Sequence, residues 1–320
     1  MKIILKTVVL LVSFYSFAQV EQTKTFSLMG SVFQITLVDK DSISSQQNIN
    51  KAIQEIDRIE HLISEWKPET QISRVNKYAG IQPIKVDKDV FELTKKAIWF
   101  SKITKGAFDI SIVAMDKIWL FDGTMEQLPS KKDIKKSIED VNFNNIILDS
   151  INSTIYLSKT GMKIGFGSIG KGYAADKARE LMQSLGVKSG IINAAGDIST
   201  WGTQINGKPW RIGVNNPYET GETLEILKFS NQNAVATSGN YEKYAEINGK
   251  RYSHIINPKT GFPSTELTSV TVIGENAEMC NGFSTSIMVL GSKKGIELVK
   301  KHPEYQYIIL TNKGKVIKNF

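Results

Sequence analysis

The hydrophobic residues of this chain recur with two different periods, which separate the expected helices from the expected strands. From Phe26 to Val38 they alternate with polar residues, and this alternation predicts one strand. A spacing of three or four residues instead predicts an amphipathic helix over 49–63, a second helix that begins after Asp87 as its N-cap, and a third over 174–185 that Gly186 closes.

Short apolar runs dominate the second half of the chain, where each is bounded by glycine or polar turn residues. They predict strands over 190–194, 210–214, 224–229, 234–238, 268–273 and 307–311. Because strands gather after a helix-rich first half and do not alternate regularly with helices, the pattern indicates an α+β fold.

Composition allows a large core and argues against a nucleic-acid partner. The chain has 320 residues, of which 41% are hydrophobic, and a formal net charge of +8 from 40 basic and 32 acidic residues. The lysines are scattered, as in Lys293-Lys294 and Lys300-Lys301, and are not interleaved with aromatic side chains. We therefore interpret them as solvated helix faces and expect no nucleic-acid binding.

The first 18 residues predict export. Lysines at the start, the apolar run Val8-Val-Leu-Leu-Val12 and the segment Ser16-Phe-Ala18 are typical of a signal peptide over 1–18 that is cleaved after Ala18. The alternative is a short membrane anchor that stays attached, although the apolar run is shorter than the ~20 residues that span a bilayer. The remaining 19–320 form one expected domain without a membrane span. Cys280 is the single cysteine, so no intrachain disulfide can form.

A glycine-rich loop, Gly165-Phe-Gly-Ser-Ile-Gly-Lys-Gly-Tyr-Ala-Ala-Asp176, predicts phosphate binding, since its glycines let a phosphate come close while a lysine and a helix N-terminus attract anions. Its glycines also match a dinucleotide-binding fingerprint and most of a Walker A loop. Asp197 comes too late for the first, and Gly172 replaces the hydroxyl residue of the second. A plain turn is the remaining alternative.

Together with the segments around it, this loop resembles the ApbE family, the FAD:protein FMN transferases, whose hallmark is an Asp-Leu-Gly-Gly/Ala-Ile-Ala-Lys-Gly-Tyr-Ala-x-Asp segment. The resemblance runs in order along most of the chain. Its further segments are Leu28-Met-Gly-Ser-Val-Phe33, Ser64-Glu-Trp-Lys-Pro-Glu-Thr-Gln-Ile-Ser-Arg-Val-Asn76, Gly106-Ala-Phe-Asp-Ile110, Asn193-Ala-Ala-Gly-Asp197, Trp210-Arg-Ile-Gly213, Thr237-Ser-Gly239 and His254-Ile-Ile-Asn-Pro-Lys-Thr-Gly261.

The resemblance implies a fold, a reaction and a location. The fold is α+β and T-fold-related, with mixed sheets and packed helices around a flavin cleft. The implied reaction is attack by a Ser or Thr hydroxyl of a partner protein on the FMN-side phosphorus of FAD, with Mg²⁺ assistance and AMP as leaving group. The expected acceptors are membrane redox subunits. The enzyme would be periplasmic or attached to the periplasmic face of the inner membrane.

The resemblance also implies roles for individual residues. Lys171 and His254 are the candidate catalytic residues; the other two histidines, His61 and His302, are expected on the surface. The candidate FAD contacts are Met29, Trp66, Ala107, Phe108, Asp109, Gly165, Lys171 and Ile255. The candidate Mg²⁺ ligands are the carbonyl of Ser168 and the side chains of Asn281, Ser284 and Thr285. Taken without the resemblance, His254 could simply hydrogen-bond a turn, and Met29 and Phe108 could be core residues.

Three positions depart from the family pattern. Gly165, Asn257 and Asn281 stand where carboxylates are expected. Mg²⁺ prefers charged oxygens, so a site with Asn281 either borrows charge from the pyrophosphate or is lost. The alternatives to the transferase are therefore a non-catalytic FAD-binding protein and an FAD pyrophosphatase that yields FMN and AMP.

Overall fold

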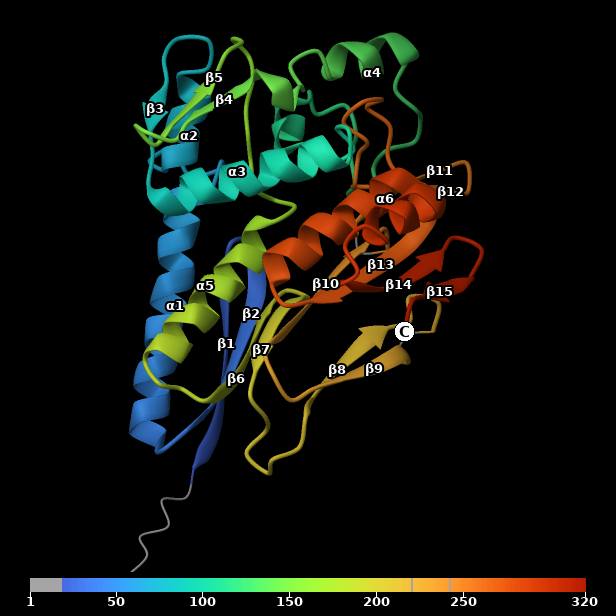
Figure 1. The fold of residues 1–320 in the computed structure, drawn as a ribbon. Helices are drawn as coiled ribbons and strands as arrows, with labels where there is room; N and C mark the ends of the chain where they lie inside the picture. Colours follow the sequence, from blue (N-terminus) through green and yellow to red (C-terminus); the bar gives the residue numbers. More distant parts are fainter. Residues whose placement is uncertain (1–18, 220, 242) are drawn as a thin grey trace, which may run out of the picture.

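An eight-stranded antiparallel sheet organises the chain (Figure 1). The computed structural model describes residues 19–320 except 220 and 242. The strands, in spatial order, are β1 (Val20–Leu28), β2 (Ser31–Asp39), β6 (Ser189–Ala194), β7 (Asp197–Trp201), β10 (Asn233–Gly239), β13 (Leu267–Gly274), β14 (Gln306–Thr311) and β15 (Val316–Lys318). Since every neighbouring pair is antiparallel, the sheet is not the parallel sheet that a Rossmann fold requires.

Both faces of this sheet are covered. One face packs against α1 (Ser42–Ile63), α5 (Gly170–Ser184) and α6 (Ala277–Val299), and this layer holds the main core (Figure 1). On the other face, the hairpin of β8 (Trp210–Asn215) and β9 (Thr223–Phe229) covers a smaller apolar cluster. Seven consecutive residues of β13 are therefore buried, because the strand has no solvated face.

Smaller elements lie over one end of the helical layer (Figure 1). These elements are α2 (Gln71–Lys77), α3 (Lys88–Ile103), α4 (Lys131–Ser137), the 3₁₀ turns η1 (Ile110–Ala114) and η2 (Phe143–Asn145), a sheet of β3 (Ile84–Lys85), β4 (Ile146–Asp149) and β5 (Thr154–Leu157), and the hairpin of β11 (Tyr244–Ile247) and β12 (Lys250–Ser253). The first turn of η1 and the segment before it border the cavity described below.

The three predicted helices and the six predicted strands of the second half are confirmed. Asp87 is the N-cap of α3, where its side chain accepts a hydrogen bond from the amide of Asp89 at 2.9 Å. Gly186 follows α5 with φ of 83°, a conformation that glycine adopts at little cost.

The single strand predicted over 26–38 is wrong. Two strands, β1 and β2, form a hairpin there, and the two residues of its turn have φ of 51° (Met29) and 65° (Gly30). This turn geometry favours Asn or Asp before glycine. Because methionine is not a typical turn residue, nothing in the sequence indicated a turn at Met29, and one strand was predicted through it.

Helix α6 was not predicted at all. Nearly every residue of its first half is buried, so no polar face marks a helical period. Gly291, with φ of 77°, breaks the helix, and the Glu266 carboxylate accepts hydrogen bonds from the amide and hydroxyl of Ser292 at 2.9 and 2.6 Å. The second half, predicted to be dominated by short strands, therefore also contains this long helix.

The predicted signal segment 1–18 lies outside the described residues. Within the part that is described, no helix has both the length and the apolar character needed to cross a bilayer.

Gly172 is required by the packing of α5 on α6. A Cβ atom at this position would lie 2.7 Å from the backbone of Ala277 and Glu278 at the start of α6. The glycine that interrupts the Walker A pattern therefore lets two helices approach each other.

We expect Gly172→Ala to reduce the free energy of unfolding by about 1–3 kcal/mol, because two backbones must move apart. Urea denaturation measures the change. Gly167→Ala is the matched control, since a Cβ there meets no atom within 4 Å. Equal stability of the two variants would contradict this account of the glycine.

Candidate active site

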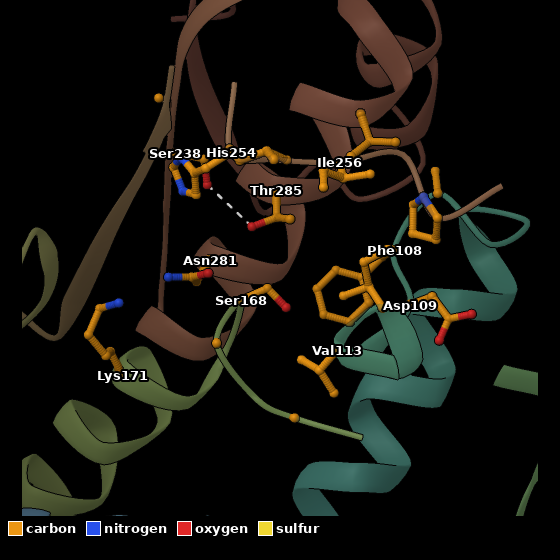
Figure 2. A pocket seen from close by; sticks show the side chains of 18 of the residues that line it. Phe108, Asp109, Val113, Ser168, Lys171, Ser238, His254, Ile256, Asn281 and Thr285 are labelled. Carbon is orange, nitrogen blue, oxygen red and sulfur yellow. Dashed lines mark hydrogen bonds between the residues drawn. The ribbon is translucent and has the colours of Figure 1, made fainter. Parts of the chain in front are cut away.

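A cavity of about 360 Å³ lies where six segments of the chain meet (Figure 2). We call it the main cavity. The glycine-rich loop and the start of α5 form one wall, α6 a second, residues 254–256 with 258 a third, and residues 107–113 a fourth. The β6–β7 turn with Asp197 and the end of β10 with Tyr241 complete the lining. It brings together ten of the predicted site residues, namely Ala107, Phe108, Asp109, Gly165, Ser168, Lys171, His254, Ile255, Asn281 and Thr285.

A second cavity of about 300 Å³, the side cavity, contains the two remaining predicted FAD contacts, Met29 and Trp66. Gly167 and Lys171 border both cavities. The Trp66 ring is 75% exposed, and the Lys117 ammonium lies 5.1 Å from its centroid. An aromatic face with this much exposure can stack on a planar ring of a ligand.

The N-terminus of α5 points to the junction of the two cavities. Its N-cap residue, Ile169, makes no side-chain hydrogen bond, and the first turn carries no acidic residue. Lys171 lies in that turn, where the helix dipole is positive and a lysine is mildly unfavourable without an anion. The junction is therefore suited to the pyrophosphate of a dinucleotide.

His254 lies at the rim of the main cavity. Its Nδ1 is 3.1 Å from the carbonyl oxygen of Lys243, and since a carbonyl only accepts, Nδ1 donates. In the neutral ring Nε2 is then the basic nitrogen. Of the other histidines, His61 is exposed on α1, whereas His302, expected on the surface, packs half-buried against Trp99 and Phe283.

The predicted metal ligands divide into two groups. Asn281 and Thr285, one helical turn apart on α6, line the main cavity together with Ser168 (Figure 2). Ser284 does not line it: this fully buried hydroxyl donates to the carbonyl of Asn281 at 3.0 Å and lies 2.8 Å from the Ser238 hydroxyl. Its place is behind the site, where it holds Ser238.

Two residues that line the main cavity were not among the predicted site residues. Asp197, buried at the end of the β6–β7 turn, accepts a hydrogen bond from the Asn281 amide. Ser238 lies on strand β10 and faces Thr285, with 3.3 Å between the hydroxyl oxygens (Figure 2). Both lie in motifs that matched the family, which was the available signal.

Asp109 and Phe108 line the main cavity and also stabilise the fold around it. One oxygen of Asp109 accepts from the amide and hydroxyl of Ser111 at 2.8 and 2.7 Å, and the other from the amide of Phe143 at 2.9 Å. Burial raises the pKa of the Asp109 carboxyl, and these hydrogen bonds act in the opposite direction. Phe108 is 1% exposed and packs 5.2 Å from the ring of Phe100, so it is a core residue as well.

Asn257 lies outside both cavities. Its side chain accepts from the amide of Lys259 at 3.0 Å, and its carbonyl accepts from the amide of Gly261 at 2.9 Å. Asp and Asn both form such turns, so this departure from the family pattern leaves the cavities unchanged.

A buried ion pair fixes α6 against α5. Asp176 accepts from the amide of Glu278 at 2.9 Å, and Arg179 lies 3.3 Å from its carboxylate. Burial raises the pKa of Asp176, whereas Arg179 and the hydrogen bonds lower it. This pair sets the position of the helix that carries Asn281 and Thr285.

A model of the ApbE family matches residues 29–309, which includes every segment that borders the two cavities. The chain belongs to the ApbE family. It is 31% identical to the FAD:protein FMN transferase of Haemophilus influenzae, over 93% of this chain and 90% of the relative. The FAD:protein FMN transferase of Escherichia coli K12 is 27% identical over 91% and 84%.

Solved structures of ApbE proteins share the fold. The ApbE protein of Thermotoga maritima superposes with a TM-score of 0.83 at 28% identity, covering 93% of this chain and 97% of that one. The apo form of the Pseudomonas stutzeri flavinyl transferase ApbE gives 0.82 at 26%, covering 95% of each chain. The predicted α+β, ApbE-like fold is therefore confirmed.

Asn281→Asp restores a carboxylate at the predicted Mg²⁺ ligand that departs from the family pattern. The new carboxylate would face Asp197, and two carboxylates this close repel each other unless a cation lies between them. We expect Mg²⁺, without FAD, to raise the melting temperature of this variant more than that of the wild type. Differential scanning fluorimetry at constant ionic strength measures the shift, and Asn281→Asp with Thr285→Val is the control. Equal shifts in wild type and variant would contradict the prediction.

Proposed function

We propose that this chain is an FAD:protein FMN transferase that moves FMN from FAD to a Ser or Thr hydroxyl of a partner protein and releases AMP. The observation that carries the proposal is the junction of the two cavities at the uncapped N-terminus of α5, with Lys171 beside it. A dinucleotide placed there has one ring system in each cavity and its pyrophosphate at the helix end.

In this arrangement the reaction needs a positioned nucleophile and neutralised charge. Lys171 and the α5 amides bind the pyrophosphate. The acceptor oxygen attacks the FMN-side phosphorus, and the bond from that phosphorus to the bridging oxygen breaks, so that AMP leaves with the bridging oxygen. Nε2 of His254 takes the proton of the acceptor hydroxyl and returns it to solvent.

The residues present fit Mg²⁺ only in part. The carbonyl of Ser168, the amide oxygen of Asn281 and the hydroxyl of Thr285 are neutral oxygen donors, and Asp197 contributes the nearby negative charge. The described residues contain no group of three His, Cys, Asp or Glu side chains suited to a metal. We propose that Ser168, Asn281 and Thr285 hold Mg²⁺ weakly, and more tightly once the pyrophosphate supplies charge. Bound there, the ion would neutralise charge on the phosphates.

The proposal extends to the location of the enzyme. The signal-like character of residues 1–18 supports export to the periplasm or to the periplasmic face of the inner membrane. Membrane redox subunits exposed to that compartment are the proposed acceptors. Fractionation of cells that express the full chain, with an antibody against it, tests the location; recovery in the cytoplasm would overturn it.

One incubation separates the three functions. Purified 19–320 is mixed with FAD, Mg²⁺ and an acceptor protein that a characterised family member modifies. We expect the acceptor to gain the mass of an FMN group and AMP to appear in equal amount. Free FMN and AMP without a labelled acceptor would indicate a pyrophosphatase, and bound, unchanged FAD a non-catalytic binding protein. NAD that binds more tightly than FAD in calorimetry would overturn the substrate assignment.

A further inference from the structure

Gly165 leaves a space that another residue fills. A Cβ atom built on Gly165 would lie 2.9 Å from both Cδ and Oε1 of Glu65. Glu65 comes directly after Ser64, the C-cap of α1. It is remote from Gly165 in the sequence, and the fold brings the two residues together. The carboxylate that is missing from position 165 is therefore replaced in space by one from a different segment.

Among the described residues, the Glu65 carboxylate has no partner other than its own backbone amide. It is half-buried and borders the side cavity beside Trp66 and Lys171, while Gly165 borders the main cavity. Among the described residues, no other residue forms a hydrogen bond or ion pair with this side chain; the neighbouring Lys67 pairs with Glu60 at 3.3 Å. Burial raises the pKa of the Glu65 carboxyl. A carboxylate can accept several hydrogen bonds, so a half-buried one whose donor is only its own backbone amide is costly to bury unless a ligand supplies more.

We propose that Glu65 is an FAD-binding residue, whose carboxylate accepts hydrogen bonds from sugar hydroxyl groups next to the pyrophosphate. The inference rests on the proposed function for the identity of the ligand. Glu65 lines the side cavity and lies against Gly165, which lines the main cavity, so it stands where the two cavities meet, and this place decides which part of FAD it contacts. The ring systems occupy the cavities and the phosphates only accept, so the donors within reach are the hydroxyls of the ribityl chain or of the ribose.

The test is FAD binding by the 19–320 protein, measured by calorimetry without an acceptor. We expect Glu65→Ala to weaken FAD binding about ten-fold to a hundred-fold, the usual effect of losing hydrogen bonds to a charged group. Glu65→Gln, which keeps an acceptor oxygen, should lose less. Glu69→Ala is the matched control, because this exposed glutamate lies in the same segment outside both cavities. Titrations with FMN and with ADP then show which half of FAD loses affinity.

A reciprocal exchange makes the test stricter. Gly165→Asp alone should bind FAD poorly, since its side chain collides with Glu65. Combined with Glu65→Ala, the same aspartate has the space and restores the carboxylate; Val113, also 2.9 Å from the new Cβ, can rotate into the main cavity. We expect the double variant to bind FAD at least several-fold more tightly than Glu65→Ala. Melting temperatures show whether each variant is folded.

The outcomes separate this inference from the proposed function. Binding of FAD by Glu65→Ala as tight as by wild type would overturn the role of Glu65 and leave the transferase proposal intact. Failure of a folded double variant to improve on Glu65→Ala would also overturn it. If the wild type bound no FAD, the proposed function itself would fail. If the double variant does not fold, Glu65→Ala decides alone.

Discussion

Replacement of His254 by alanine should lower the rate of FMN transfer by about 10²–10⁴-fold while leaving FAD binding and folding nearly unchanged. Loss of a general base has an effect of this size. His254 is exposed at the cavity rim and anchored through Nδ1 to the carbonyl of Lys243, so its removal opens no hole in the core. Single-turnover transfer to a saturating acceptor measures the rate.

Two controls make this result specific. His61→Ala removes an exposed histidine of α1 that lines neither cavity, and should transfer FMN at the wild-type rate. Added imidazole should restore part of the activity of His254→Ala, because it can take the acceptor proton in the vacated space. Transfer by His254→Ala within a few-fold of wild type would remove this residue from the mechanism.

Replacement of Arg179 by methionine should reduce the free energy of unfolding by about 3–5 kcal/mol, the usual cost of leaving a buried charge without its partner. Arg179 is 1% exposed, and it donates to the hydroxyl of Ser199 at 3.2 Å and to the carbonyl of Glu275 at 3.0 Å. Without it, the Asp176 carboxylate is buried with no cation. Urea denaturation with an unchanged m-value gives the difference.

The pH dependence of this loss has a definite sign. Removing Arg179 removes an influence that lowers the pKa of Asp176, so the pKa of this buried carboxyl rises further in the variant. A carboxyl whose folded pKa is raised destabilises the protein when ionised. The deficit should therefore be largest at neutral pH and shrink as the pH falls through that pKa. Lys177→Met, which removes partly exposed pairs with Glu180 at 3.0 Å and with Asp89 at 3.5 Å, is the control and should cost at most about 1 kcal/mol. A similarly small loss in Arg179→Met would contradict the account.

The sequence predicted the meeting of distant segments but not their fine arrangement. The glycine loop, His254 and Asn281 were placed in one site because their motifs match a family in order, and the structure brings them to one cavity. The distinction between Ser284 and Thr285 could not be read in the same way. Successive helix residues point about 100° apart, and only the packing of α6 on β10 decides which hydroxyl faces the cavity.

Compensation between segments was also invisible to the sequence. Gly165 and Asn281 looked like lost carboxylates, because a motif compares each position only with itself. The structure places the Glu65 carboxylate beside Gly165 and the Asp197 carboxylate beside Asn281. These contacts join residues far apart in the chain, so they depend on the topology and not on local pattern.

The β1–β2 hairpin sets the distance between the side cavity and Val20. Met29, in its turn, borders the side cavity, while Val20 begins β1 at the opposite end of the strand. A nine-residue strand spans about 30 Å. A protein held at a bilayer by its first residues would therefore carry its FAD up to about that height above the lipid. Acceptor hydroxyls on domains that stand clear of the headgroups would then be within reach, whereas those level with the membrane surface would not.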